Sequence, residues 1–179
     1  MNWHRRMCRV GAGALVLLLT ACMASTGTIN SNKSETYAGT TKKLLIVANM
    51  GNSLVIPRGN ENGLFSSTMS DTLARCGTQT EYFAPNPIAI KDVAGEHIRA
   101  FGPDSILTIN WQSERSGQYV HDIVYLVQLV DVKSKAVVWK ASVNFSQHWN
   151  PAVTLAGIII GRMKQDGLID ASCTVPQVT

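Results

Sequence analysis

Apolar and polar positions follow two periods along this chain, one typical of strands and one typical of helices. The segment 43–49 carries an unbroken apolar run, as expected for an interior strand covered on both faces. Three later segments, 105–112, 119–132 and 137–145, show the alternation typical of strands, and the second is apolar on both faces over 123–127. Their closeness in sequence predicts an antiparallel meander. A short strand is also expected at 78–83.

Helical spacing of apolar residues predicts three helices. They cover about 63–75, 88–101 and 151–166, and a glycine follows each of them closely. Asn150 is the expected N-cap of the last helix. The resulting order, β-α-β-α-β-β-β-α, predicts an α+β fold with a mixed sheet of about five strands and three helices. Parallel pairing is expected between the strands at 43–49 and 105–112.

The last predicted helix is apolar on nearly every side between Ala152 and Met163. Such a helix has to be buried, either in the core against the sheet or against a partner, where Gly157 and Gly161 would permit close approach. At about 12 residues it is too short to cross a membrane, which takes about 20. We favour the core position.

A secretory leader is indicated at the N-terminus, where Arg5, Arg6 and Arg9 precede the uncharged apolar run 10–19. The run ends in Leu19-Thr20-Ala21-Cys22, a junction that resembles the lipobox of bacterial lipoproteins. The resemblance implies cleavage before Cys22 and a diacylglycerol, with chains such as palmitate, on its sulfur. The alternative is an ordinary soluble signal peptide with a coincidental cysteine.

Charge and composition change once residues 1–21 are removed. Three arginines and no acidic residue leave with them, so the formal charge falls from +4 to +1. The basic pI therefore belongs mostly to the leader, and no basic patch indicates a nucleic-acid partner. Met23 stands where inner-membrane lipoproteins usually have Asp, which favours the outer membrane, with the domain in the periplasm.

Three regions are expected: a leader at 1–21, a lipidated Cys22 with a flexible tether up to residue 41, and a single domain at 42–179. The tether prediction rests on the few large apolar residues and many Ser, Thr, Asn and Gly residues in 23–41. A coil of this length spans roughly 25 Å.

Two cysteines remain after Cys8 is discarded and Cys22 is acylated. In an oxidising periplasm, Cys76 and Cys173 are expected to form a disulfide that pins the C-terminal tail to the body. Its long loop is worth on the order of 4 to 5 kcal/mol in the chain-entropy description. The alternative is two separate thiols, with Cys76 buried as a small hydrophobic residue.

The order of elements, together with the hairpin Asp131-x-x-Ser134-x-x-x-Val138-Trp139, resembles small periplasmic lipoprotein domains related in shape to the N-terminal domain of TolB. Lipoproteins that activate peptidoglycan synthases, and others that support secretion channels, are similar in this respect. The resemblance implies an accessory role in the envelope and a protein partner there. Trp139 itself is expected to be a core anchor.

Catalytic motifs are not recognisable in the sequence, and neither a cofactor nor a metal ion is expected. His97, His121 and His148 have no second ligand at helical or hairpin spacing. Trp149 is expected to hold the start of the last helix rather than to stack on a sugar.

A partner-binding surface is expected in the loop 51–63, which is long, polar and rich in glycine and asparagine. It carries Arg58, Asn60 and Asn62.

The sequence therefore predicts a lipid-anchored outer-membrane lipoprotein that is not an enzyme. It would serve as an accessory or binding module for an envelope protein in cell-wall synthesis, secretion or transport, and self-association is a further expectation. The alternative is a lipid-anchored periplasmic hydrolase or small-ligand-binding protein that uses the 51–63 loop. A filled core beneath that loop would count against the alternative.

Overall fold

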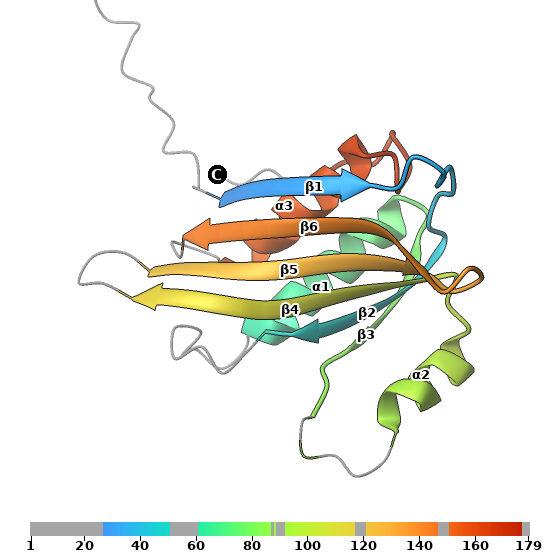
Figure 1. Ribbon diagram of the computed structural model, residues 1–179, viewed down its shortest axis with the longest axis horizontal. Helices are drawn as coiled ribbons and strands as arrows, with labels where there is room; N and C mark the ends of the chain where they lie inside the picture. The colour runs from blue at the N-terminus through green and yellow to red at the C-terminus, as the bar shows by residue number, and fades with distance from the viewer. Residues whose placement is uncertain are drawn as a thin grey trace, which may run out of the picture.

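The computed structural model describes residues 27–50, 61–86, 88, 92–116, 121–146 and 151–176. Within these ranges, six strands form one mixed sheet in the order β1-β6-β5-β4-β2-β3, and three helices accompany it (Figure 1). The predicted α+β class is confirmed, with one strand more than expected. The elements are β1 (Gly27–Lys33), β2 (Lys43–Asn49), α1 (Glu61–Arg75), β3 (Gln79–Phe83), α2 (Val93–Phe101), β4 (Ser105–Ser116), β5 (His121–Asp131), β6 (Ala136–Ser146) and α3 (Pro151–Gln165).

The middle of the sheet follows the sequence pattern closely. β2 pairs in parallel with β4, as predicted, and with β3 on its other side. Leu44, Leu45 and Ile46 are fully buried, which agrees with a strand covered on both faces. β4, β5 and β6 form the predicted antiparallel meander, with a register shift in β4 between Trp111 and Ser113.

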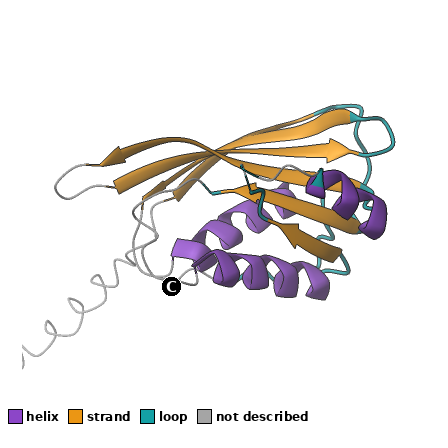
Figure 2. Cartoon of the chain, turned by 90° about the horizontal axis from the view of Figure 1, so that it is seen from below, coloured by secondary structure: helices purple, strands orange, loops and turns teal. Residues whose placement is uncertain are grey.

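One face of the sheet carries the core, because α1 and α3 lie side by side against it (Figure 2). Along β6 from Trp139 to Phe145, the residues on this face are buried and those on the opposite face are exposed. The buried set of the sheet includes Leu107, Ile109, Tyr125, Val127, Leu129, Trp139, Ala141, Val143 and Phe145.

Of the two positions considered for the apolar helix, α3 occupies the core. Leu155, Ile159, Ile160 and Met163 are at most 3 % exposed, and they belong to the same cluster as the sheet residues. Its partly buried Ile158 lies against Gly27 at the start of β1, so this side of the helix is also covered by the chain itself.

The flexible tether was predicted to extend to residue 41, and this prediction is wrong from residue 27 onward. β1 pairs antiparallel with β6 along its whole length, from Gly27 opposite Phe145 to Lys33 opposite Trp139. Tyr37 then packs against the core. An edge strand needs few large apolar residues, because β6 supplies its hydrogen-bond partners and only every second side chain faces inward. Composition alone therefore misjudged this segment.

Helix α2 begins at Val93, whereas the spacing of apolar residues had placed its start near Ile88. Asp92 is the reason, since its side chain accepts a hydrogen bond from the backbone N–H of Gly95 at 2.9 Å and caps the helix. At the other end, Gly102 takes a left-handed conformation with φ of 61°, and its N–H bonds to Ile98 O. The expected cap Asn150 lies outside the described residues.

Candidate functional site

The predicted disulfide joins Cys76, directly after α1, to Cys173 in the C-terminal tail. The two residues are 97 positions apart in sequence, with Cα atoms 4.7 Å apart, and both side chains are buried. Lys164 adds a hydrogen bond from its Nζ to the carbonyl oxygen of Cys173 at 2.6 Å. The tail is thus fixed to the helical layer, as the sequence predicted.

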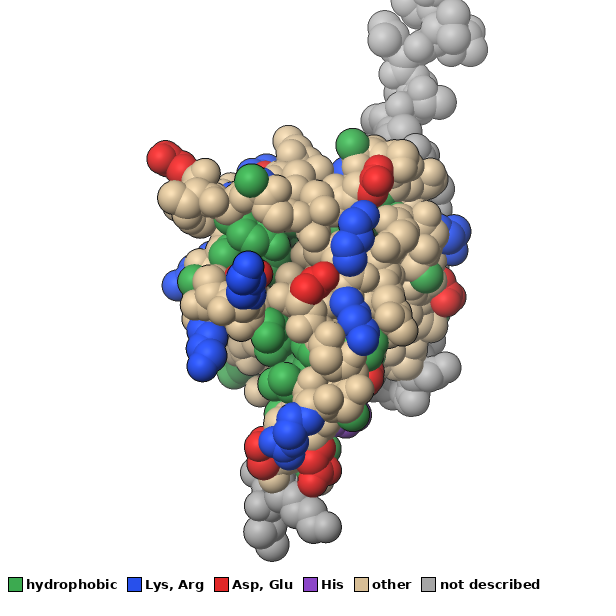
Figure 3. Space-filling model, turned by 90° about the vertical axis from the view of Figure 1, so that its right-hand side faces the viewer, with side chains coloured by type: hydrophobic (Ala, Val, Ile, Leu, Met, Phe, Trp, Pro, Cys, Tyr) green, Lys and Arg blue, Asp and Glu red, His purple; other side chains and the backbone are tan. Residues whose placement is uncertain are grey.

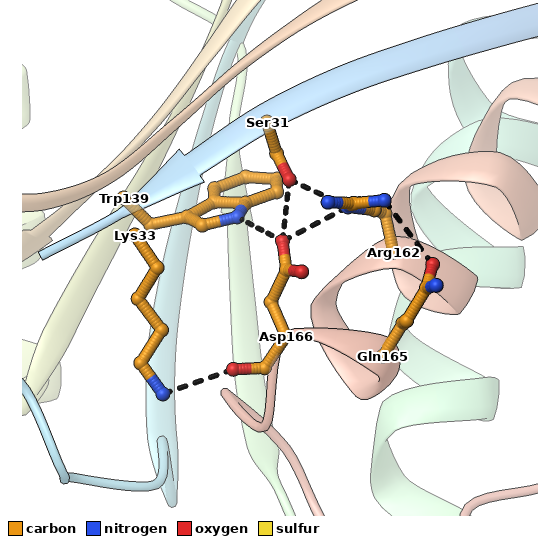
Figure 4. Close-up of polar contacts among 6 residues, drawn as sticks. All are labelled: Ser31, Lys33, Trp139, Arg162, Gln165 and Asp166. Atoms are coloured by element: carbon orange, nitrogen blue, oxygen red, sulfur yellow. Dashed lines mark hydrogen bonds and ion pairs between the residues drawn. The ribbon is translucent and has the colours of Figure 1, made fainter. Parts of the chain in front are cut away.

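Trp139 is the buried core residue that its position in the hairpin predicted, and it also belongs to a polar cluster (Figure 4). Its Nε1 donates to Asp166 Oδ2 at 2.7 Å. The same oxygen accepts from Ser31 Oγ at 2.5 Å and from Arg162 Nε at 3.0 Å. Lys33 Nζ donates to the backbone oxygen of Asp166 at 2.9 Å. These contacts join β1 and β6 to the end of α3.

Electrostatics at Asp166 follow from these partners. Partial burial by itself raises the pKa of the carboxyl group, but the hydrogen bonds from Ser31, Trp139 and Arg162 together outweigh it. The pKa therefore lies below its ordinary value, and the carboxylate stays charged. The base beside Ser31 is the carboxylate of Asp166, which is a weak base because its pKa is lowered, and the described residues of the cluster include no histidine. The contacts connect strand β1 to the end of helix α3.

A small cavity lies at the end of the sheet where β1 begins and where β2 and β6 end, at Gly27, Asn49 and Ser146; we call this the proximal end. The cavity measures about 30 Å³, enough for about one or two water molecules. It is too small for a substrate. It is lined by Met50, Glu61, Asn62, Phe65, Ile123, Tyr125, Phe145, Pro151, Ala152 and Leu155.

Polar groups near this cavity serve mainly in packing. The hydroxyl of Tyr82 donates to Asn62 Oδ1, and its ring meets that of Phe65 edge-on, with centroids 6.3 Å apart. Burial raises the pKa of Tyr82 to about 12. Burial, with smaller contributions from Glu114 and Tyr82, also raises the pKa of Tyr125 to about 12.

The residues expected to form a partner-binding loop are only partly described. Asn62 lies in the first turn of α1, exposed and bonded to Tyr82, while Arg58 and Asn60 lie outside the described residues. The site expected at these three residues therefore stays a prediction. One buried oxygen near the cavity, Glu61 Oε2, has no hydrogen-bond partner among the residues that the structure describes.

Histidine chemistry is limited to one contact in the part of the chain that the structure describes. His97 Nδ1 contacts Glu81 Oε1, and the His97 ring lies 4.7 Å from that of Phe83, centroid to centroid. This pair was not predicted, because Glu81 lies on β3, 16 residues before His97 in the sequence. The side chains of His121, His148 and Trp149 lie outside the described part.

The described ranges lack two features, a metal-binding group and a membrane-spanning helix. They contain no group of three or more His, Cys, Asp or Glu residues that could hold a metal ion. They also contain no helix long and apolar enough to cross a membrane.

Comparison with known proteins identifies a fold. No protein-family model and no curated protein matches the sequence. Among solved structures, PelC from Paraburkholderia phytofirmans, a dodecamer, is similar with a TM-score of 0.50 at 17 % identity; the match covers 77 % of this chain and 95 % of PelC. Lipoprotein GNA1162 from Neisseria meningitidis matches with a TM-score of 0.39 at 16 % identity, and the match covers 69 % of this chain and 98 % of the GNA1162 chain. The chain thus shares the α+β fold of PelC.

Proposed function

We propose that this chain is an outer-membrane lipoprotein, anchored by a diacylated Cys22, that serves as a non-enzymatic accessory module in the periplasm. The observation that carries the proposal is the junction Leu19-Thr20-Ala21-Cys22, which stands five residues before the first strand of the sheet. Cleavage before Cys22 would remove the leader and leave every described element in place. The mature domain would then begin almost at the membrane.

The buried disulfide between Cys76 and Cys173 supports this compartment. Disulfides persist in the oxidising periplasm and are rare in the reducing cytosol. A bond that fixes the tail to the helical layer therefore fits a chain that is exported before it folds.

Self-association and an envelope protein partner form the second part of the proposal. PelC, which shares the fold, is a dodecamer. In this chain the sheet face of β6 opposite the helices is exposed, with Lys140, Ser142 and Asn144 along it, and β1 and β3 are open edges of the sheet. Surfaces of this kind are available for contacts between copies or with another protein.

The anchor is tested by replacing the acceptor cysteine in cells. We expect wild-type protein to incorporate radiolabelled palmitate and to sediment with the outer membrane, and we expect Cys22→Ser to lose both properties. Cys8→Ser is the matched control, because Cys8 lies in the same leader without an apolar run before it. Palmitate labelling that survives in Cys22→Ser would refute the proposal.

Assembly is tested on detergent-solubilised lipoprotein by native mass spectrometry. The expected result is a discrete oligomer, and crosslinking in cells should capture an envelope protein. A strict monomer at micromolar concentration would remove the self-association part and leave the anchor unaffected.

A further inference from the structure

We infer that the proximal end of the domain rests on the lipid bilayer through apolar side chains. The inference depends on the proposed anchor at Cys22 and adds an orientation to it. Three features carry it: the short reach of the chain between Cys22 and β1, the apolar side chains at the proximal end, and the distribution of charge between the two ends of the sheet.

The reach of the chain restricts where the domain can be. β1 begins at Gly27, five residues after Cys22. Five residues span at most about 18 Å when fully extended. Had the segment up to residue 41 been a free coil, the domain could have stood away from the membrane. Because β1 is fixed to β6 and packed against Ile158, the acylated cysteine instead holds the proximal end close to the bilayer.

The opposite end of the sheet, which carries the β5–β6 turn and which we call the distal end, is much farther from the anchor. Gly27 of β1 pairs with Phe145 of β6, and Phe145 is nine residues away from Ala136, the residue of β6 next to that turn. Nine residues of antiparallel strand cover about 31 Å. The distal end could touch the same bilayer only if the domain lay on its side with the connecting chain fully stretched, which costs conformational entropy.

Two exposed large apolar side chains lie in the proximal part of the domain, and a third, Val137, lies at the distal end with 42 % exposure. Leu64, in the first turn of α1, is 37 % exposed, and Trp111, the seventh of the twelve residues of β4, is 40 % exposed. β2 ends opposite Asn110, so the neighbouring strand does not continue beside Trp111. Leu64 is close in sequence to Phe65, which lines the cavity described above. Tryptophan is enriched where protein meets the lipid headgroup region, because its ring is apolar and its N–H is polar.

The charges argue for contact with the apolar part of the bilayer rather than with its phosphates. At the proximal end, Glu61, Glu114 and Asp122 are acidic, and Arg115 is the basic residue of the described part there. Attraction to anionic lipid needs clusters of lysine or arginine. The turn at the distal end carries exposed Lys133 and Lys135 instead (Figure 3 views this side of the molecule). If attraction between charges held the domain on the membrane, the distal end would face the bilayer. The proximal and distal orientations can therefore be distinguished by experiment.

The experiment measures the depth of a nitroxide label at each end. Leu64→Cys at the proximal end and Lys133→Cys in the β5–β6 turn place exposed cysteines for labelling, since Cys22 is acylated and Cys76 and Cys173 are paired. The full acylated protein is reconstituted into phosphatidylcholine vesicles, and collision of each label with oxygen and with a water-soluble nickel chelate is measured by electron paramagnetic resonance.

We expect the oxygen-to-nickel collision ratio at Leu64→Cys to rise when the protein is reconstituted into vesicles. The ratio at Lys133→Cys should not change. The reference value for each label is measured on the Cys22→Ser protein in detergent-free solution. The ratio at Leu64→Cys should not respond to salt. A rise at Lys133→Cys, or aqueous values at both positions on vesicle-bound protein, would overturn the orientation while leaving the anchor intact. Acylated protein that does not bind vesicles would overturn the anchor and the orientation together.

Discussion

Asp166 is the residue whose removal should most affect the attachment of β1. In Asp166→Ala, the Nε1 of Trp139 loses its hydrogen-bond acceptor, although the Trp139 side chain is only 1 % exposed. Ser31 and Arg162 each lose one hydrogen bond as well. Hydrogen bonds to charged groups contribute about 1.5–3 kcal/mol each, and a buried donor left without a partner costs about 1–3 kcal/mol.

The three bonds share one oxygen, and Arg162 is 26 % exposed, so their contributions do not add. We therefore expect a loss of about 3 kcal/mol in the free energy of unfolding, measured by urea denaturation and far-ultraviolet circular dichroism. For a domain of this size that corresponds to a fall of roughly 10 °C in Tm. Hydrogen exchange should also accelerate first in β1, because two of the lost bonds join the end of α3 to β1 and β6.

The matched control is Asp71→Ala, which removes an exposed carboxylate from α1. Its free energy of unfolding should change by no more than about 0.5 kcal/mol. The pKa of Asp166 is lowered in the folded state, so its stabilising contribution is complete above the ordinary aspartate pKa and is lost as the pH falls through the lower folded value. The difference between Asp166→Ala and wild type should therefore shrink in strong acid. Equal stability of the two variants at pH 7 would refute the reasoning.

Three further predictions concern other parts of the fold. Cys173→Ser should lower the free energy of unfolding by about 3–5 kcal/mol, measured by urea denaturation, and dithiothreitol should then have no further effect; a variant as stable as wild type would contradict this. Tyr82 and Tyr125 should ionise near pH 12 in an ultraviolet titration, and since folding raises both pKa values, the stability they confer should be lost between pH 10 and about 12; ionisation of these two residues near pH 10 in the folded protein would exclude it. Gly102→Ala should cost about 1 kcal/mol, because φ of 61° is unfavourable for alanine, and an unchanged urea midpoint would contradict this.

The elements predicted best from the sequence are those whose own side chains are buried. β2 shows its interior position as an unbroken apolar run, and α3 shows its burial as a helix with almost no polar side. The disulfide was predictable because Cys76 and Cys173 are the two cysteines that remain once Cys8 and Cys22 are assigned. The apolar patterns of β2 and α3 are local signals, and the disulfide follows from the number of cysteines that remain.

What the sequence did not reveal depends on a partner far along the chain. β1 exists because β6, over a hundred residues later, pairs with it, and its own residues carry only the weak alternation of an edge strand. The polar cluster joins Ser31 to Asp166, 135 positions away. Arg162 and Asp166, four residues apart at the end of α3, were a visible pair, but nothing in the sequence indicated Trp139 or Ser31 as their partners.

The pairing of β1 with β6 also determines how the domain resists force. A pull on Gly27 parallel to β1, opposed by a force at the distal end of the sheet, would load the backbone hydrogen bonds to β6 together in shear rather than opening them one after another. The hydrogen bonds from Ser31 and Lys33 to Asp166 hold the C-terminal half of β1. If the chain is anchored at Cys22 as we propose, the pairing of β1 with β6 would oppose a pull from the membrane parallel to β1.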